Sequence, residues 1–124
     1  MVGGWKIELK NFSRKELECP CCEKFGVDPK SGEKLQKLRD LAGPININSA
    51  FRCEKQNQKV RGAKNSFHVL GKAFDIKTSK MSPQEKEDLV TKAISLGFRG
   101  IGIYDKHIHI DDRENQARWV GKSS

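Results

Sequence analysis

A carboxylate in the middle of an apolar segment places the strongest constraint on how this chain can fold. Residues 71–78 have the pattern of a β-strand, and Asp75 stands between Phe74 and Ile76 within it. Burying an ionised carboxylate is costly unless it is paired with another charge or bound to a metal ion. We therefore expect a partner for Asp75 close to this strand.

The three histidines of the chain are the candidate partners. His107 and His109 lie two residues apart on a predicted strand, so both side chains can point to one face. His68 precedes Asp75 by seven residues, and Gly71 between them lets the chain turn back into the strand. Two histidines and one aspartate with an open fourth position form the ligand set of a catalytic zinc ion. The alternative for each histidine is a hydrogen-bonded residue of the core or surface.

The order of predicted elements indicates an α+β fold, in which helices flank a small antiparallel sheet. Helices are expected from a capping box at Ser13 toward Cys19, over residues 32–43 and 54–60, and from a capping box at Ser82 to Gly97. Strands are expected at residues 45–49 and 71–78, with a hairpin formed by residues 100–104 and 106–111 and a surface loop at 61–65.

The length of 124 residues suits one domain spanning residues 1–124, with its core at about residues 12–119. No window approaches the run of about 18 apolar residues that a membrane span requires. The first residues, with Lys6 and Glu8, do not resemble a Sec-type signal peptide. We expect a monomer without a membrane span.

The formal net charge of +8 predicts attraction to polyanions. The partner could be nucleic acid or an anionic cell wall. Because the basic residues are scattered along the chain, a solvated basic surface is the alternative. Charge alone does not identify the partner.

Three of the four cysteines are packed into one short segment. Cys19, Cys21 and Cys22 lie close together, whereas Cys53 stands alone. A structural zinc site with four cysteines normally has two pairs, so a single distant cysteine leaves three alternatives open: a local disulfide, free thiols and a structural zinc ion.

The segment from Ser66 to Asp75 resembles the signature Ser-x-His-x-x-Gly-x-Ala-x-Asp of the D-Ala-D-Ala carboxypeptidase family of zinc peptidases. Residues 107–109 resemble the His-x-His element that this family shares with its lysostaphin and Hedgehog relatives. Residues 47–52 are similar to the family's strand ending in Ser-Gly-Tyr-Arg, and residues 100–104 to the strand before the last zinc ligand. The resemblance covers approximately residues 12–119.

The resemblance implies that His68, Asp75 and His109 bind Zn²⁺. Arg52 would bind the substrate carbonyl or carboxylate and stabilise the oxyanion, because a guanidinium presents two donors to negative charge without titrating. Ser66 would orient His68 or contact the substrate. Other polar neighbours, Asp111 and Arg113, are expected to support the ligands or the fold.

The general base departs from the family pattern. Many relatives place an acid three residues before the last ligand, where this chain has Lys106. His107, on the same strand face as His109, is the preferred candidate for moving the proton. Asp105 is the alternative if the turn brings it toward the metal.

The expected substrate is a peptidoglycan stem peptide, cut at the terminal D-Ala-D-Ala bond or at an internal bond such as L-Ala-D-Glu. Such a chain resembles a phage or prophage endolysin that accumulates in the cytoplasm and acts on the cell wall, and an extracellular location is the alternative. Tyr104 and Trp119 would line the substrate groove or belong to the core. Two alternatives remain: a catalytically silent zinc-containing binding domain of the same fold, and a basic zinc knuckle that binds nucleic acid.

Overall fold

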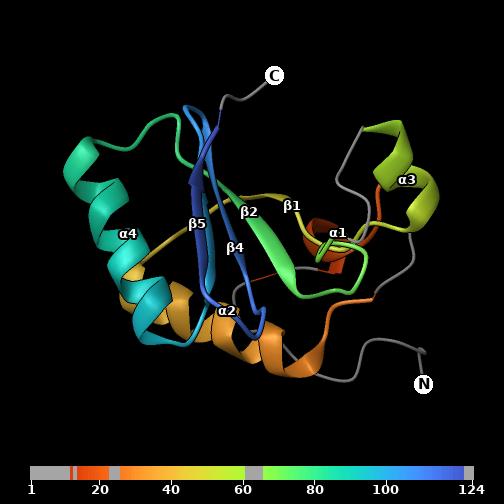
Figure 1. Ribbon diagram of the computed structural model, residues 1–124, viewed down its shortest axis with the longest axis horizontal. Helices are drawn as coiled ribbons and strands as arrows, with labels where there is room; N and C mark the ends of the chain where they lie inside the picture. The colour runs from red at the N-terminus through yellow and green to blue at the C-terminus, as the bar shows by residue number, and fades with distance from the viewer. Residues whose placement is uncertain (1–11, 13, 23–25, 61–65, 122–124) are drawn as a thin grey trace.

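Helices and strands alternate irregularly along the computed structural model, which describes residues 12, 14–22, 26–60 and 66–121. The helices of this described part are α1 (Arg14–Leu17), α2 (Pro29–Ala42), α3 (Glu54–Lys59) and α4 (Pro83–Ser95). Its strands are β1 (Ile47–Ser49), β2 (Ala73–Lys77), β3 (Gly100–Ile103), β4 (His107–Asp111) and β5 (Ala117–Val120). The arrangement, shown in Figure 1, confirms the predicted α+β class.

The strands form one sheet in the order β1-β2-β4-β3-β5. Strands β3 and β4 form the predicted antiparallel hairpin. Strand β2 pairs antiparallel with β4, which sets Asp75 opposite His109 and Lys77 opposite His107. Strand β5, which the sequence pattern did not predict, pairs with β3 in the parallel direction. The sheet is therefore mixed, with antiparallel pairing at its centre.

The two central strands separate apolar from polar side chains. Phe74, Ile76, Ile108 and Ile110 are fully buried in the main hydrophobic cluster. Because side chains alternate along a strand, residues 75, 107, 109 and 111 point to the opposite face of the sheet. That face carries Asp75 of β2 and both histidines of β4.

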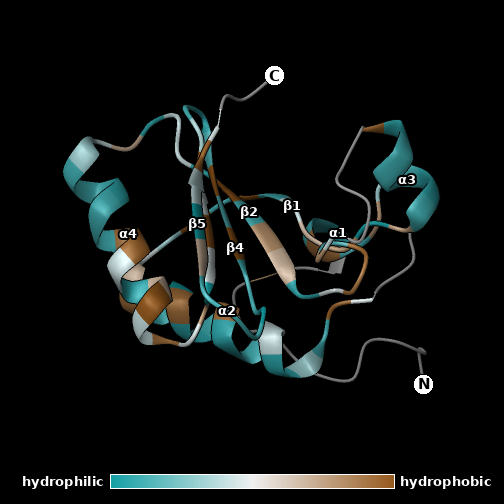
Figure 2. Cartoon of the chain, viewed as in Figure 1, coloured by the Kyte–Doolittle hydropathy of each residue, from teal (hydrophilic) through white to brown (hydrophobic). Residues whose placement is uncertain are grey.

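Helices α2 and α4 cover the apolar face of the sheet. Leu35 and Leu38 of α2, with Leu89 and Ala93 of α4, belong to the same buried cluster as the strand residues. Figure 1 shows α1 and α3 on the other side of the sheet from α4. Figure 2 shows hydrophobic colour where α4 approaches the sheet and hydrophilic colour along α3. One face of the sheet thus packs into the core, and the opposite face is available for a functional site.

Local sequence signals explain where the longer helices begin. Helix α2 starts three residues before the predicted boundary, because Asp28 caps it by accepting a hydrogen bond from the backbone N–H of Ser31 at 3.1 Å. The capping box of Ser82 and Glu85 opens α4 as predicted. The predicted cap at Ser13 and the predicted loop at 61–65 lie outside the described residues.

None of the helices in the described ranges is both long and apolar enough to cross a membrane.

Candidate metal centre

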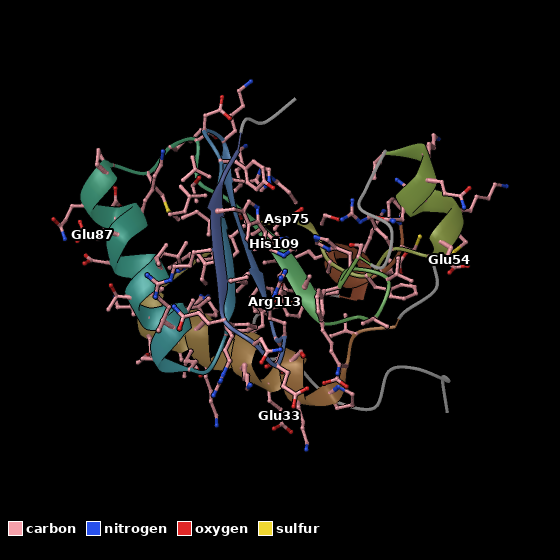
Figure 3. All side chains as sticks on the ribbon, in the orientation of Figure 1. Glu33, Glu54, Asp75, Glu87, His109 and Arg113 are labelled. Atoms are coloured by element: carbon pink, nitrogen blue, oxygen red, sulfur yellow. The ribbon has the colours of Figure 1, made fainter. Side chains whose placement is uncertain are left out.

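Three side chains converge on the polar face of the sheet. The pairing of β2 with β4 sets Asp75 beside His109, and the turn before β2 brings in His68. Asp75 Oδ1 lies 3.2 Å from His68 Nε2 and 3.0 Å from His109 Nδ1. Figure 3 shows Asp75 and His109 next to one another, with Arg113 nearby. The structure thus brings together the three residues that the resemblance implied as metal ligands.

The His68 imidazole is oriented through its other nitrogen. Nδ1 lies 2.6 Å from the carbonyl oxygen of Ala50. Because a carbonyl only accepts hydrogen bonds, Nδ1 carries the proton and Nε2 presents a lone pair. The residue is 1% exposed, yet Nε2 has no hydrogen-bond partner among the described residues. A buried lone pair that faces a carboxylate oxygen needs a cation between them, so the donor set fits a zinc ion.

His109 is held by a chain of charged side chains. Its Nε2 lies 2.7 Å from Asp111 Oδ2, while Nδ1 faces Asp75. Asp111 is fully buried and accepts hydrogen bonds from Arg113 Nε at 2.8 Å and Nη2 at 2.6 Å. The Arg113 guanidinium in turn lies 4.7 Å from the ring centre of Phe67. Metal-binding histidines usually have such a carboxylate partner, which fixes the ring and raises its basicity.

The electrostatics of the site favour ionised carboxylates. Burial raises the pKa of Asp75, but the hydrogen bond with His109 outweighs this and holds its pKa well below the usual range. Burial has the same opposing effect at Asp111, where the hydrogen bonds from Arg113 and His109 bring the pKa to about 2. Burial lowers the pKa of His109, and its bonds to Asp111 and Asp75 reverse that and raise it. Asp75 is therefore an anion at neutral pH.

A tight turn carries His68 into the site. Ser66 Oγ accepts a hydrogen bond from the backbone N–H of His68 at 3.1 Å, and Gly71 N–H bonds to His68 O at 3.1 Å. Gly71 has a positive φ of 74°, and a Cβ there would lie 1.7 Å from Gly26 O. Only glycine fits both conditions. Ser66 thus holds the backbone of His68, whereas Ala50 orients its ring.

Arg52 follows β1 and reaches the same region. Its backbone N–H bonds to His68 O at 3.2 Å. Burial lowers the pKa of Arg52, and the negative charge of Asp75 opposes that shift. The guanidinium therefore interacts electrostatically with one of the candidate metal ligands. Arg52 Nε is buried and has no hydrogen-bond partner in the described part of the chain. The side chain therefore retains a donor that no described residue uses.

An aromatic group borders the histidines. His107 stacks on Tyr104 with ring centres 4.3 Å apart, and Tyr104 Oη accepts a hydrogen bond from Trp119 Nε1 at 2.8 Å. The Trp119 ring centre lies 5.3 Å from that of His109. Trp119 can lean over β3 because Gly102 beneath it has no side chain, and a Cβ there would meet the indole at 2.5 Å. Both aromatics thus border the site while remaining partly exposed.

The candidates for the general base differ in their surroundings. His107 is half-buried, and burial lowers its pKa. Asp105 and Lys106 are exposed in the turn between β3 and β4. Of the two candidates, His107 has the side chain on the polar face of the sheet beside His109.

The four cysteines form a second group of side chains that could bind a metal ion, and none of the four forms a disulfide in the described structure. Burial raises the pKa of Cys19, but hydrogen bonds from the backbone of Cys53 and Cys21 and from their thiols bring it to about 6. The hydrogen bond with Cys53 raises the pKa of Cys21 to about 12. The disulfide that the sequence left open is not formed here.

One known protein family matches most of the length of the chain. The family model described as Peptidase M15 matches residues 10–111, which include Arg52 and the three candidate metal ligands. No curated protein matches the chain. The family match favours a peptidase over the nucleic-acid-binding zinc knuckle.

Proposed function

Because this chain belongs to the peptidase M15 family of zinc-dependent metallopeptidases, we propose that it hydrolyses the stem peptides of peptidoglycan. In this proposal His68, Asp75 and His109 hold the zinc ion. The observation that carries it is the buried Nε2 of His68, which lacks a hydrogen-bond partner among the described residues and lies 3.2 Å from Asp75 Oδ1. Three protein ligands leave one position for water or substrate, as in catalytic zinc sites.

The ligands differ in how they contribute. His68 uses Nε2 and His109 uses Nδ1, and each has its second nitrogen engaged by Ala50 O or Asp111 Oδ2. This fixes both rings before metal binds. Bound zinc supplies a Lewis acid that polarises a carbonyl group and activates water near neutral pH.

Arg52 is proposed to bind the substrate. Its Nε, which has no hydrogen-bond partner among the described residues, and its electrostatic interaction with Asp75 support a role in which the guanidinium binds the scissile carbonyl or a terminal carboxylate. As negative charge develops on the carbonyl oxygen, a fixed guanidinium stabilises it without needing a proton. A terminal carboxylate would instead receive two parallel hydrogen bonds.

His107 is proposed to move the proton. It lies two residues from His109 on β4 and is neutral more readily than an exposed histidine, because burial lowers its pKa. A neutral imidazole accepts a proton from water and can then deliver it to the leaving amine. Asp105 remains the alternative base, whereas exposed Lys106 is a poor one.

The substrate is proposed to lie along the aromatic group formed by Tyr104, His107 and Trp119. The substrate classes are the terminal D-Ala-D-Ala bond and an internal bond such as L-Ala-D-Glu, and we favour lysis of the wall in the manner of an endolysin. The net charge of +8 would help the enzyme remain on an anionic wall.

The test is mass spectrometry of purified peptidoglycan after digestion by the zinc-loaded protein. His68→Ala is the inactive control, and Lys80→Ala, at an exposed position after β2, is the matched surface control. Loss of a terminal D-Ala would identify a carboxypeptidase, and a new internal terminus would identify an endopeptidase. If the wild-type protein binds zinc and leaves every muropeptide unchanged, the catalytic proposal fails. The exposed Lys106 where relatives carry an acid would then favour a silent zinc-containing binding domain.

A further inference from the structure

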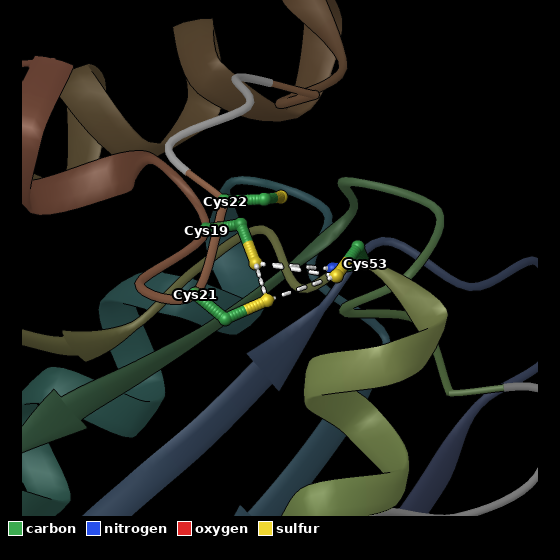
Figure 4. Close-up of side chains that lie close together, drawn as sticks. All are labelled: Cys19, Cys21, Cys22 and Cys53. Carbon is green, nitrogen blue, oxygen red and sulfur yellow. Dashed lines mark hydrogen bonds between the residues drawn. The ribbon is translucent and has the colours of Figure 1, made fainter.

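The four cysteines come together from two distant segments, in a place separate from the histidine site. Cys19, Cys21 and Cys22 follow helix α1, whereas Cys53 is the residue before helix α3. Figure 4 shows Cys19, Cys21 and Cys53 joined in a triangle of contacts, with Cys22 beside them. The Sγ–Sγ distances in the triangle are 3.6, 3.6 and 3.3 Å.

These distances match a tetrahedron of sulfur atoms around one metal ion. With zinc–sulfur bonds of about 2.3 Å, neighbouring ligand atoms in a tetrahedron lie about 3.8 Å apart. The sulfur of Cys22 also lies within 4.8 Å of the other three, so it can complete the set. A single disulfide would use two of the sulfurs and leave a third unpaired in contact with it. The similar spacing of the three thiols fits a shared ion better than a disulfide between two of them.

Backbone donors also point at the sulfurs. The N–H of Cys53 bonds to Cys19 Sγ at 3.4 Å, and the N–H of Gln56 bonds to Cys53 Sγ at 3.4 Å. Such bonds favour sulfur in its thiolate form, which is the form that binds metal. We propose that Cys19, Cys21, Cys22 and Cys53 bind a second zinc ion, distinct from the ion at the histidine site. Four thiolates leave no open position, so this zinc ion is structural.

The second zinc ion has a defined place in the fold. It joins the segment after α1 to the residue that follows Arg52. A backbone hydrogen bond from Phe51 N–H to Leu17 O at 3.3 Å links the residues next to these two segments. Helix α1 has only one turn and helix α3 only polar residues, so neither packs a large apolar face. The ion therefore supplies a crosslink that the small core does not, and it fixes the backbone on one side of Arg52.

Metal content tests the proposal without reference to activity. Zinc is measured by elemental analysis and native mass spectrometry on the full chain, purified under reducing conditions. We expect about two zinc ions in the wild type, and about one in both Cys21→Ser and His68→Ala, because each variant removes a ligand from a different site. Cobalt substitution identifies the ligands, since near-ultraviolet sulfur-to-cobalt bands should persist in His68→Ala and be lost or strongly weakened in Cys21→Ser.

A second measurement covers the case in which Cys21→Ser does not fold. The wild-type protein is treated with iodoacetamide before and after zinc removal by a chelator, and its intact mass is compared. We expect the cysteines to be protected while zinc is bound and all of them to be alkylated after its removal. The proposal is overturned if wild type holds about one zinc ion that His68→Ala abolishes, or if the unreduced protein shows the mass deficit of a disulfide.

Discussion

His109 Nε2 lies 2.7 Å from the buried carboxylate of Asp111, two residues further along β4. This contact leaves His109 Nδ1 to face Asp75 and His68. We predict that Asp111→Asn weakens zinc binding at the histidine site by about 10- to 100-fold, because the ring loses the anion that fixes it and raises its basicity. Zinc affinity is measured by competition with a chromophoric chelator.

The neighbouring carboxylate is the matched control for this variant. Asp112 forms an ion pair with Lys34 at 2.7 Å and accepts a hydrogen bond from Ser31. Asp112→Asn should lower stability without changing the zinc affinity of the histidine site. Equal affinities in the wild type and Asp111→Asn would show that Asp111 serves only the fold.

Arg52 is expected to act on the substrate and not on the metal. We predict that Arg52→Ala lowers kcat/KM by about 10²- to 10³-fold, as removal of an oxyanion donor does, with zinc content unchanged. Arg118→Ala is the control, since Arg118 is an exposed arginine of β5. Steady-state kinetics on a synthetic stem peptide would count against this role if the Arg52 and Arg118 variants behaved alike.

His107 and Asp105 give opposite expectations as general bases. Replacing the true base should lower kcat by about 10²- to 10⁴-fold while zinc remains bound. We predict this loss for His107→Ala and near wild-type turnover for Asp105→Ala, because His107 is half-buried beside His109 and Asp105 is exposed. The reverse result would make Asp105 the base and His107 a residue of the aromatic group.

Gly102 controls the position of Trp119. A Cβ at this position would meet the indole at 2.5 Å, so Gly102→Ala should displace the ring from Tyr104 and His109. We predict a fall in kcat/KM of about tenfold, which corresponds to about 1.4 kcal/mol, with zinc retained. Ile103→Ala, at the next and exposed position of β3, is the control. Unchanged kinetics in Gly102→Ala would mean that Trp119 does not contact the substrate.

Local signals in the sequence predicted most elements, whereas the resemblance to a family implied the three candidate ligands that the structure brings together. The spacing from His68 to Asp75 predicts a turn that leads into a strand. The spacing from His107 to His109 predicts that both side chains point to one face of a strand. The capping box at Ser82 likewise fixes the start of α4. Features set by near neighbours in the chain were therefore predictable.

Features that depend on distant contacts were not predictable from one sequence. Strand β5 is short and half exposed, and it exists because β3 offers it a parallel partner. The sequence did not indicate whether Trp119 belongs to the core or to the site, because its position depends on the space that Gly102 leaves free in the folded chain. Cys53 looked solitary, although its sulfur lies against that of Cys21, which precedes it by 32 residues. Only the folded chain brings these residues together.

The most direct test of the central claim starts from the metal-free protein and asks whether added zinc restores cleavage of a synthetic stem peptide. Turnover is followed by mass spectrometry as zinc is added back, for the wild type and for Asp75→Ala. We predict no turnover without zinc, a rise that saturates as the histidine site fills, and no turnover by Asp75→Ala at the same zinc concentrations. Cleavage by the metal-free protein, or by Asp75→Ala at the wild-type rate, would contradict the account.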